Sequence, residues 1–595
     1  MRVDGYAPIR EYAAIGDGRA AALVALDGSI DWLCLPDFDS ASVFAAILDA
    51  ERGGRFALEP EAAYDVGRRY VPDTNVLETT FRTAEGVVRV TDALTLPGRG
   101  LAPSRELARR VEGLSGVVPM RWRVEPRFQY AAQAPRIAQR GGPAVAEHGR
   151  DALAVSSWDA GGPEVEPGAL SGQFVARQGT RALLVLGSAH EEPLVFPDRD
   201  GAEERLDDTV AFWRRWAESR DYAGPWHEAV VRSALLLKLL VFAPSGAVIA
   251  APTTSLPETI GGERNWDYRF SWIRDSAFAV EALLDLGCAR EADAFVSWLS
   301  HASQLTHPRL QVLYKLNGDH RTPEERLPLA GYRGSTPVRV GNAAAAQRQL
   351  DVYGDLIQTA WIYSRRGAEL DRDIGQRLAE IADLVCKIWR ETDSGIWEVR
   401  SEPLHFTQSK MLCFVALTRA IELADANVIP GKNSEQWRRE ATAIQDFVES
   451  RCFSPSKGAY VRAAGSEELD ASLLLASLAG YSKGDDPRLV ATIDAIRREL
   501  GRGPLLYRYL CEDGLRGHEG VFLPCSFWLV EALARAGRFD EAGELMEQLL
   551  DLANDVGLYA EEIEPETGDF LGNFPQGLVH LALVSAAVCY AESTP

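Results

Sequence analysis

The N-terminal part of the chain, residues 1–205, consists of short stretches in which apolar and polar side chains alternate, separated by Gly and Pro. The alternation is clearest in VLETTFRTAEGVVRVTDAL, residues 76–94, where Glu85-Gly86 predicts the turn of a hairpin. The other predicted strands cover residues 117–128, 151–159 and 172–188. Residues 131–151 lack such a pattern and are interpreted as an exposed loop. The pattern predicts a β-sandwich of mostly antiparallel strands.

From Trp226 onward the apolar residues recur with helical spacing. The predicted helices begin near Trp226, Ile273, Arg290, Ala345, Asp371, Thr407, Glu435, Asp470, Asp486, Leu523, Asp540 and Pro575. Short links alternate with long ones, which predicts six helical hairpins arranged in a ring, an (α/α)6 barrel. We therefore expect a β-sandwich domain at residues 1–205, a helical linker at 206–225 and a barrel at 226–595.

Composition and charge narrow the function classes. A chain of 595 residues, 46% hydrophobic and 25% charged, is long enough for at least two folded domains. The net charge of −23 disfavours binding to nucleic acid or to an anionic membrane surface, and it suits a neutral or cationic small molecule. Fourteen Trp fit large cores and stacking platforms for sugar rings equally well.

Targeting signals and metal motifs are not visible in the sequence. The N-terminal residues show no basic segment followed by an apolar one, and the run ALLLKLLVFA from Ala234 is too short to span a bilayer. The eight Cys form no CxxC pair. We expect a reduced, cytoplasmic protein without a structural metal, and the sequence leaves a homodimer open.

The long loops that precede every second helix are rich in aromatic rings, acids and arginines. The most unusual is ERNWDYRFSWIRDSAF, in which neither helical nor strand periodicity is clear. These loops cover residues 263–278, 332–355, 393–411, 505–528 and 558–577. In a ring of hairpins they fall at the same end of the barrel, so we expect a pocket there.

Two acidic elements of these loops could carry proton transfer. Glu398 follows Trp397, and desolvation of a carboxyl against an indole favours the protonated form that a general acid needs. The run YAEEIEPE, residues 559–566, offers four Glu, one of which could activate a water as general base. His405 and His580 fall in or near the loops and could contact a substrate. The sequence contains no P-loop, no HExxH zinc motif and no GxSxG elbow.

The motifs NWDYRFSWIRDS, GIWEVR…FTQSKM, YRY…EGVFLPCSFW and YAEEIEPETGDFLGNFPQGLVHLAL resemble those of family 15 glycoside hydrolases, the glucoamylase and bacterial trehalase group. The N-terminal YAAIGDGRAAALVALDGSIDWLCLPDFDSASVFAAILD is similar to the β-rich domain of the trehalase-like members. The resemblance spans nearly the whole chain. It implies an antiparallel β-supersandwich followed by an (α/α)6 barrel, and inverting hydrolysis of a terminal α-glucosidic bond.

By motif position, the resemblance implies that Glu398 is the general acid and Glu561 the general base. Arg274 and Asp275 resemble the pair that hydrogen-bonds the hydroxyls of the non-reducing glucose. Tyr268 matches an aromatic hydroxyl near the nucleophilic water.

The same resemblance implies that Trp272 and Trp397 wall the glucose site and that Arg508 binds the sugar. The family often has Gln after the base, whereas this chain has Glu562, which we expect to contact the substrate. The motif leaves open whether Glu561 or Glu562 is the base.

The implied mechanism needs two carboxyls about 6.5–9.5 Å apart with a water between the base and the sugar, and it releases β-glucose. It requires no metal or organic cofactor. The expected substrate is a small α-glucoside, with trehalose first on the analogy of the N-terminal domain. A glucoamylase-type hydrolase of α-1,4- and α-1,6-linked glucans is the alternative. A phosphorylase or transglycosylase on the same scaffold and an inactive sugar-binding protein are also considered.

Overall fold

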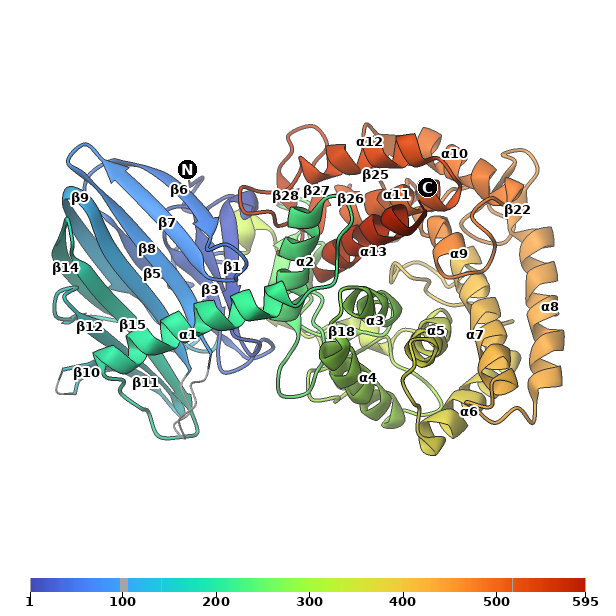
Figure 1. Cartoon of the computed structure of the whole chain (residues 1–595), viewed down its shortest axis with the longest axis horizontal. Coiled ribbons are helices and arrows are strands. Elements are labelled where there is room, and N and C mark those ends of the chain that lie inside the picture. The colour runs from blue at the N-terminus through green and yellow to red at the C-terminus, as the bar shows by residue number, and fades with distance from the viewer. Residues whose placement is uncertain (1, 97–104, 141, 516, 594–595) are drawn as a thin grey trace.

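The computed structural model describes residues 2–96, 105–140, 142–515 and 517–593. Its N-terminal third contains two layers of antiparallel strands, which lie beside a ring of helices (Figure 1). The first layer holds β1 (Tyr12–Gly16), β2 (Ala21–Ala25), β3 (Ile30–Cys34), β4 (Ser42–Phe44), β5 (Phe56–Pro60), β13 (Glu164–Glu166) and β14 (Ala169–Arg177). The second holds β6 (Tyr64–Tyr70), β7 (Leu77–Thr83), β8 (Gly86–Thr95), β10 (Arg136–Gln139), β11 (Ala144–His148), β12 (Asp151–Trp158) and β15 (Arg181–His190).

The long strand β9 (Glu106–Val124) belongs to both layers. Its first half pairs with β8 and β15, and its second half pairs with β5 and β14. Arg109, in the first half, forms an ion pair of 2.8 Å with Asp92, and both side chains are fully buried. The same guanidinium donates to the carbonyl oxygens of Phe56 and Gly28. Arg109 therefore ties the two layers together.

The predicted hairpin at residues 76–94 is confirmed as β7 and β8, with Arg82 opposite Val87. The prediction of an exposed loop at residues 131–151 is wrong, because β10 and β11 pair there as a hairpin at the edge of the second layer. A polar edge strand is held by backbone hydrogen bonds and needs little apolar alternation.

Helix α1 (Arg199–Glu218) packs on β8 and leads into the helical ring (Figure 1). The predicted boundary at residue 205 falls inside this helix. The division into the ranges 1–205, 206–225 and 226–595 stays a prediction.

In the described part of the chain, twelve helices after α1 form two concentric layers. The inner helices are α3 (Ser276–Asp285), α5 (Val352–Arg365), α7 (Thr407–Asp425), α9 (Leu475–Leu478) with the preceding 3-10 turn η4 (Ala471–Leu474), α11 (Leu523–Arg535) and α13 (Gly577–Ser593). The outer helices are α2 (His227–Leu240), α4 (Ala289–Gln304), α6 (Arg372–Ile388), α8 (Ser434–Arg451), α10 (Pro487–Leu500) and α12 (Phe539–Leu550).

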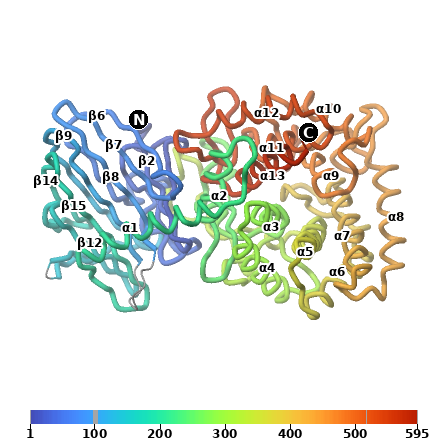
Figure 2. Tube along the Cα trace, viewed as in Figure 1, coloured from blue at the N-terminus to red at the C-terminus, as the bar shows by residue number. Residues whose placement is uncertain are grey.

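Each inner helix contacts the next, and α13 closes the ring against α3. Figure 2 shows the chain travelling around this ring, and α13 at its end packs against α2 at its start. The predicted β-sandwich followed by an (α/α)6 barrel is confirmed. The largest shift is in the fourth helix, expected near Ala345, where a 3-10 turn η3 (Ala343–Ala346) precedes α5.

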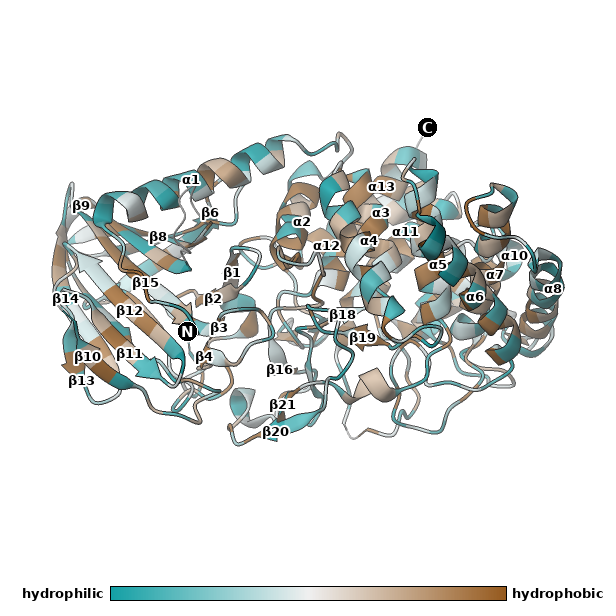
Figure 3. Ribbon diagram, turned by 90° about the horizontal axis from the view of Figure 1, so that it is seen from below, coloured by the Kyte–Doolittle hydropathy of each residue, from teal (hydrophilic) through white to brown (hydrophobic). Residues whose placement is uncertain are grey.

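The links that enter the inner helices carry short strand pairs. They are β16 (Thr254–Pro257), β17 (Asn265–Asp267), β18 (Ser271–Trp272), β19 (Leu313–Tyr314), β20 (Glu325–Leu327), β21 (Val338–Val340), β22 (Phe453–Ser454), β23 (Ala459–Tyr460), β24 (Gly501–Arg502), β25 (Leu505–Leu506), β26 (Val521–Phe522), β27 (Glu562–Ile563) and β28 (Phe570–Leu571), with the 3-10 turn η2 (Tyr332–Gly334). Another 3-10 turn, η1 (Ile9–Glu11), precedes β1 at the start of the β-sandwich. Figure 3 shows β16 and β18–β21 together at one end of the helices.

The β-sandwich supports this end of the ring. The indole of Trp32 donates to the carbonyl oxygen of Pro252 at 2.8 Å, and Arg269 donates to that of Ser40 at 2.8 Å. Both contacts hold segments next to the aromatic run at residues 263–278. Among the described helices, none is long and apolar enough to cross a membrane.

Candidate active site

Glu561 lies immediately before β27 in the link that enters α13. Tyr268 Oη donates to Glu561 Oε1 at 2.7 Å, and the Asn573 N–H donates to Oε2 at 3.3 Å. Glu561 is 1% exposed, and this burial raises the pKa of its carboxyl to about 7, while Arg508 and the Tyr268 hydrogen bond act in the opposite direction. Burial also raises the pKa of Tyr268, so its phenol remains a donor. Glu561 is therefore a carboxyl poised to change charge near neutral pH.

Glu398 lies in the link that enters α7, in a left-handed backbone conformation with φ of 58°. This conformation is strained for a residue other than glycine, and such strain concentrates at functional sites. Trp272 Nε1 donates to Glu398 Oε1 at 2.8 Å, and Arg274 Nη1 approaches the same oxygen at 3.4 Å. No donor among the described residues binds Oε2, so that oxygen can carry a proton toward a ligand.

Two aromatic rings separate these carboxyls. The rings of Tyr268 and Trp272 meet edge to face, with centroids 5.3 Å apart. Tyr268 holds Glu561, and Trp272 holds Glu398. Each carboxyl is thus bound by a different ring of the 263–278 run, and the rings act as a spacer between them.

Arg274 and Asp275 lie beside Glu398, where α3 begins. Arg274 Nε donates to Asp275 Oδ1 at 3.0 Å, and Nη1 donates to the carbonyl oxygen of Ile396 at 2.8 Å. Burial disfavours the charge of Arg274, but Asp275 and Glu398 hold its pKa above the ordinary value. The two side chains are 16% and 14% exposed, so both remain available to sugar hydroxyls.

Trp397 does not contact Glu398 in the way the sequence suggested. Its indole Nε1 donates to Asp470 Oδ1 at 2.8 Å, and its ring packs against Phe522 and Trp528. The indole that binds Glu398 is that of Trp272. The two sequence neighbours therefore have different partners, Trp272 for Glu398 and Asp470 for Trp397.

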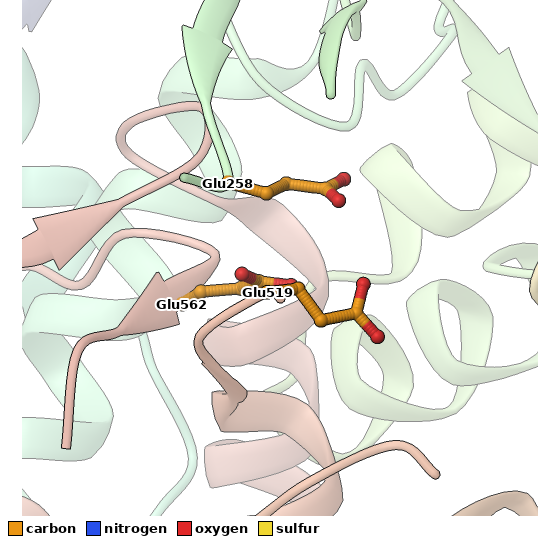
Figure 4. A group of neighbouring side chains, drawn as sticks. All are labelled: Glu258, Glu519 and Glu562. Carbon is orange, nitrogen blue, oxygen red and sulfur yellow. The ribbon is translucent and has the colours of Figure 1, made fainter. Parts of the chain in front are cut away.

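Arg508 lies in the link that enters α11 and contacts three carboxyls, those of Glu258, Glu519 and Glu562. Figure 4 shows these three Glu side chains gathered together. Its Nη2 lies 3.2 Å from Glu258 Oε2, 3.2 Å from Glu562 Oε1, and in direct contact with Glu519 Oε2. The three Glu place one oxygen each within 4.8 Å of one another, a spacing that could hold a metal ion. The guanidinium contacts all three oxygens, so the positive charge at this centre comes from the protein itself.

Glu561 and Glu562 face opposite sides of the chain, as successive residues entering a strand do. Glu561 faces Tyr268, whereas Glu562 faces Arg508 and accepts from the Gly520 N–H at 2.9 Å. The side chain of Glu562 has no exposed surface. Of the two, only Glu561 adjoins the aromatic run.

All nine residues predicted for the site belong to one connected cluster. The residues are Tyr268, Trp272, Arg274, Asp275, Trp397, Glu398, Arg508, Glu561 and Glu562. Arg508 connects to Trp397, with the guanidinium 5.6 Å from the ring centre. Their roles stay predictions at this point, but the long links do bring them together.

Sequence reasoning missed Glu258 and Glu519. Glu258 lies in the stretch TSLPE, outside the loops expected to form the pocket. Glu519 opens the motif EGVFLPCSFW in the link that also holds Arg508, but no role was predicted for it, whereas Glu258 comes from a different link and reaches Arg508 only in the folded chain. His580, by contrast, is fully buried against Ser233 and Tyr559 in the packing of α13. His405 packs against Phe447.

Comparison with known proteins gives matches over most of the chain. The model of glycosyl hydrolases family 15 matches residues 224–588, and that of the trehalase-like N-terminal domain matches residues 3–156. The chain is 40% identical to a trehalase of Mycolicibacterium smegmatis over 98% of this chain and 91% of the relative. It is 35% identical to a trehalase of Thermoplasma volcanium over 99% and 94%.

Solved structures show the same architecture. A bacterial glucoamylase crystallised in complex with acarbose superposes with a TM-score of 0.72 over 100% of this chain and 95% of the other, at 14% sequence identity. At that identity the likeness concerns the fold alone.

Proposed function

The chain belongs to glycosyl hydrolases family 15, and on that premise we propose that it hydrolyses trehalose to two glucose molecules with inversion at the attacked carbon. That it is a glycoside hydrolase follows from the family. The choice of trehalose is supported by relatives named trehalase that align along nearly the entire chain.

Two carboxyls held by different rings carry the proposed mechanism. Glu398, protonated on the oxygen that no described residue binds, donates to the glycosidic oxygen as the bond lengthens. Glu561 accepts a proton from a water that attacks the opposite face of the sugar, and Tyr268 orients the base. The rings of Tyr268 and Trp272, each hydrogen-bonded to one of the two carboxyls, are in contact with each other.

The glucose that is attacked is held by charged and aromatic groups. Arg274 and Asp275 hydrogen-bond its hydroxyls, Trp272 lies against its ring, and Arg508, held by Glu562, contacts it as well. Glu562 acts on the site through Arg508 and not as the base. The location of the protein in the cell and a homodimer stay predictions from the sequence.

A substrate panel tests the proposal. Glucose release is measured from trehalose, maltose, isomaltose and soluble starch, and we expect trehalose to have the highest kcat/KM. A preference for maltose or starch would show that the activity is that of a glucoamylase and not that of a trehalase. If the folded protein released glucose from none of these substrates, the sugar-binding alternative would be favoured.

The anomers of the first products test the stereochemistry. Hydrolysis of α,α-trehalose with inversion gives one β-glucose from the attacked unit and one α-glucose from the leaving unit, which proton NMR resolves before mutarotation. Two α-glucose molecules would mean retention and would contradict the assignment of Glu561 as base.

Substitution tests the two catalytic roles. Glu398→Gln and Glu561→Gln should each lower kcat by about 10²–10⁴-fold, because a positioned acid or base contributes about that factor. Glu564→Gln, in the same acidic run but only partly buried, is the matched control and should not lose activity. Circular dichroism and the thermal unfolding midpoint check that each variant is folded.

A further inference from the structure

Arg508 Nη2 has fewer hydrogens than the carboxyl oxygens that surround it. Nη2 carries two hydrogens but contacts three carboxyl oxygens, from Glu258, Glu519 and Glu562. Glu562 Oε1 is buried and has no hydrogen-bond partner among the described residues. A protonated Glu562 would not need a hydrogen from Arg508 to offset a negative charge on this oxygen.

The cluster also holds more carboxyls than positive charges that could balance them. The side chains of Glu258, Glu519 and Glu562 are 3%, 9% and 0% exposed, and Arg508 is 8% exposed. The nearby Arg264 pairs with Asp513 at 2.7 Å and only approaches Glu519, at 3.4 Å. Buried carboxylates without a counter-charge are costly, and such groups retain protons instead.

Other ionisable groups also face this cluster. They are Arg264, Asp513, Tyr509, Tyr268, Glu561, Glu398 and Cys525. Of these, Glu561 is the proposed base, and it directly precedes Glu562. Three ionised carboxylates around one arginine would therefore place excess negative charge beside the base and keep it protonated.

We propose that Glu258 and Glu562 are positioning residues that stay neutral at neutral pH, holding Arg508 as carboxylic acids while Glu519 alone balances its charge. Glu561 is then the carboxyl that gains and loses a proton in this part of the site. The inference rests on the proposed role of Glu561 as base. Burial, which raises the pKa of both Glu258 and Glu562 against the opposing effect of Arg508, supports it.

The acid limb of the pH profile of kcat/KM tests the proposal. This limb reports the ionisation of Glu561 in the free enzyme. Glu258→Gln and Glu562→Gln keep the shape of a neutral carboxylic acid, so the midpoint of the limb should stay within about 0.3 pH unit even where kcat falls. If either residue is ionised in the working enzyme, the amide removes a negative charge beside Glu561, and the midpoint moves down by about one unit or more. Such a downward shift would overturn the proposal.

A triple variant is the matched control. Adding Glu519→Gln to the double variant Glu258→Gln/Glu562→Gln removes the last carboxylate and leaves no neighbour able to ionise in its place. The midpoint should then move to lower pH, because Arg508 acts on Glu561 without a counter-charge. An unchanged midpoint in the triple variant would show that the cluster does not act on the base, and this too would refute the proposal.

Infrared spectroscopy gives a readout that does not depend on activity. The difference spectrum of the wild type minus the double variant at neutral pH should contain the carbonyl stretch of protonated carboxyl groups. Loss of carboxylate bands alone would overturn the inference. Failure of the proposed function is distinguishable, because it appears as full activity of Glu561→Gln whatever the infrared result.

Discussion

Replacement of Tyr268 by Phe removes one hydrogen bond from the proposed base and leaves the ring in place. The bond is 2.7 Å long and ends on a carboxyl that is 1% exposed, so solvent does not screen it appreciably. It stabilises the charged form of Glu561 and so lowers the pKa, which burial alone would place higher. Removing it must therefore raise the pKa of Glu561.

The size of the shift follows from the energy of the bond. A hydrogen bond to a charged group contributes about 1.5–3 kcal/mol, which at about 1.4 kcal/mol per unit raises the pKa by about 1–2 units. Starting from about 7, the acid limb of kcat/KM moves toward about pH 8–9. The base acts as the carboxylate, so at pH 7 the active fraction falls from about half to about 1–10%, a loss of about 5–50-fold.

The assay is kcat/KM for trehalose from about pH 5 to about pH 10. We expect Tyr268→Phe to recover toward the wild-type rate as the pH rises through the new midpoint. The control is Tyr481→Phe, which removes a similar hydrogen bond of 2.9 Å to Glu449 elsewhere in the barrel and should leave the limb in place. A loss of equal size at every pH would show that Tyr268 does not act on the charge of Glu561.

Two more substitutions give separate checks. Trp272→Phe removes the indole donor to Glu398 and should lower kcat about 10-fold, as expected for about 1.4 kcal/mol. Trp397→Phe loses a hydrogen bond of equal length to a different carboxyl and should lower kcat less. Equal losses of kcat, measured by steady-state kinetics, would contradict the assignment of these indoles to their carboxyls. Arg109→Met leaves the buried Asp92 without its partner and should destabilise the β-sandwich by about 3–5 kcal/mol. Calorimetry should detect this as a lower temperature of the first unfolding transition. An unchanged transition temperature would mean that the ion pair does not stabilise the sandwich.

The outer helices of the barrel were predictable because they are buried on one side only. In α6, for example, the apolar positions lie on one face, and an Asp371 N-cap marks the start. The prediction was wrong at residues 131–151, where the strand β10 is short, half polar and partly exposed. A strand of this kind is specified by the neighbour with which it pairs, which is information that the local sequence does not contain.

The candidate site was predictable to the level of residues but not of contacts. Long motifs located Glu398 and Glu561, whereas the partner of Glu398 was expected to be Trp397 and is Trp272. The two indoles come from different links, and no pattern in the sequence shows which of them meets Glu398. Glu258 was missed for a related reason, because its function depends on three links that meet only in the folded chain.

The difference in exposure between the two proposed catalytic carboxyls has a mechanistic meaning. An acid must face a leaving group that departs to solvent, whereas a base in an inverting enzyme faces only a water held against the sugar. The side chain of Glu398 is 18% exposed and Glu561 is 1% exposed, which is the order that these tasks require. Arg274 contacts Glu398 and Asp275 together, so a glucose bound by that pair also fixes the acid. The attacked glucose would then lie innermost, with the leaving sugar on the open side, and the site would act on chain ends and small disaccharides.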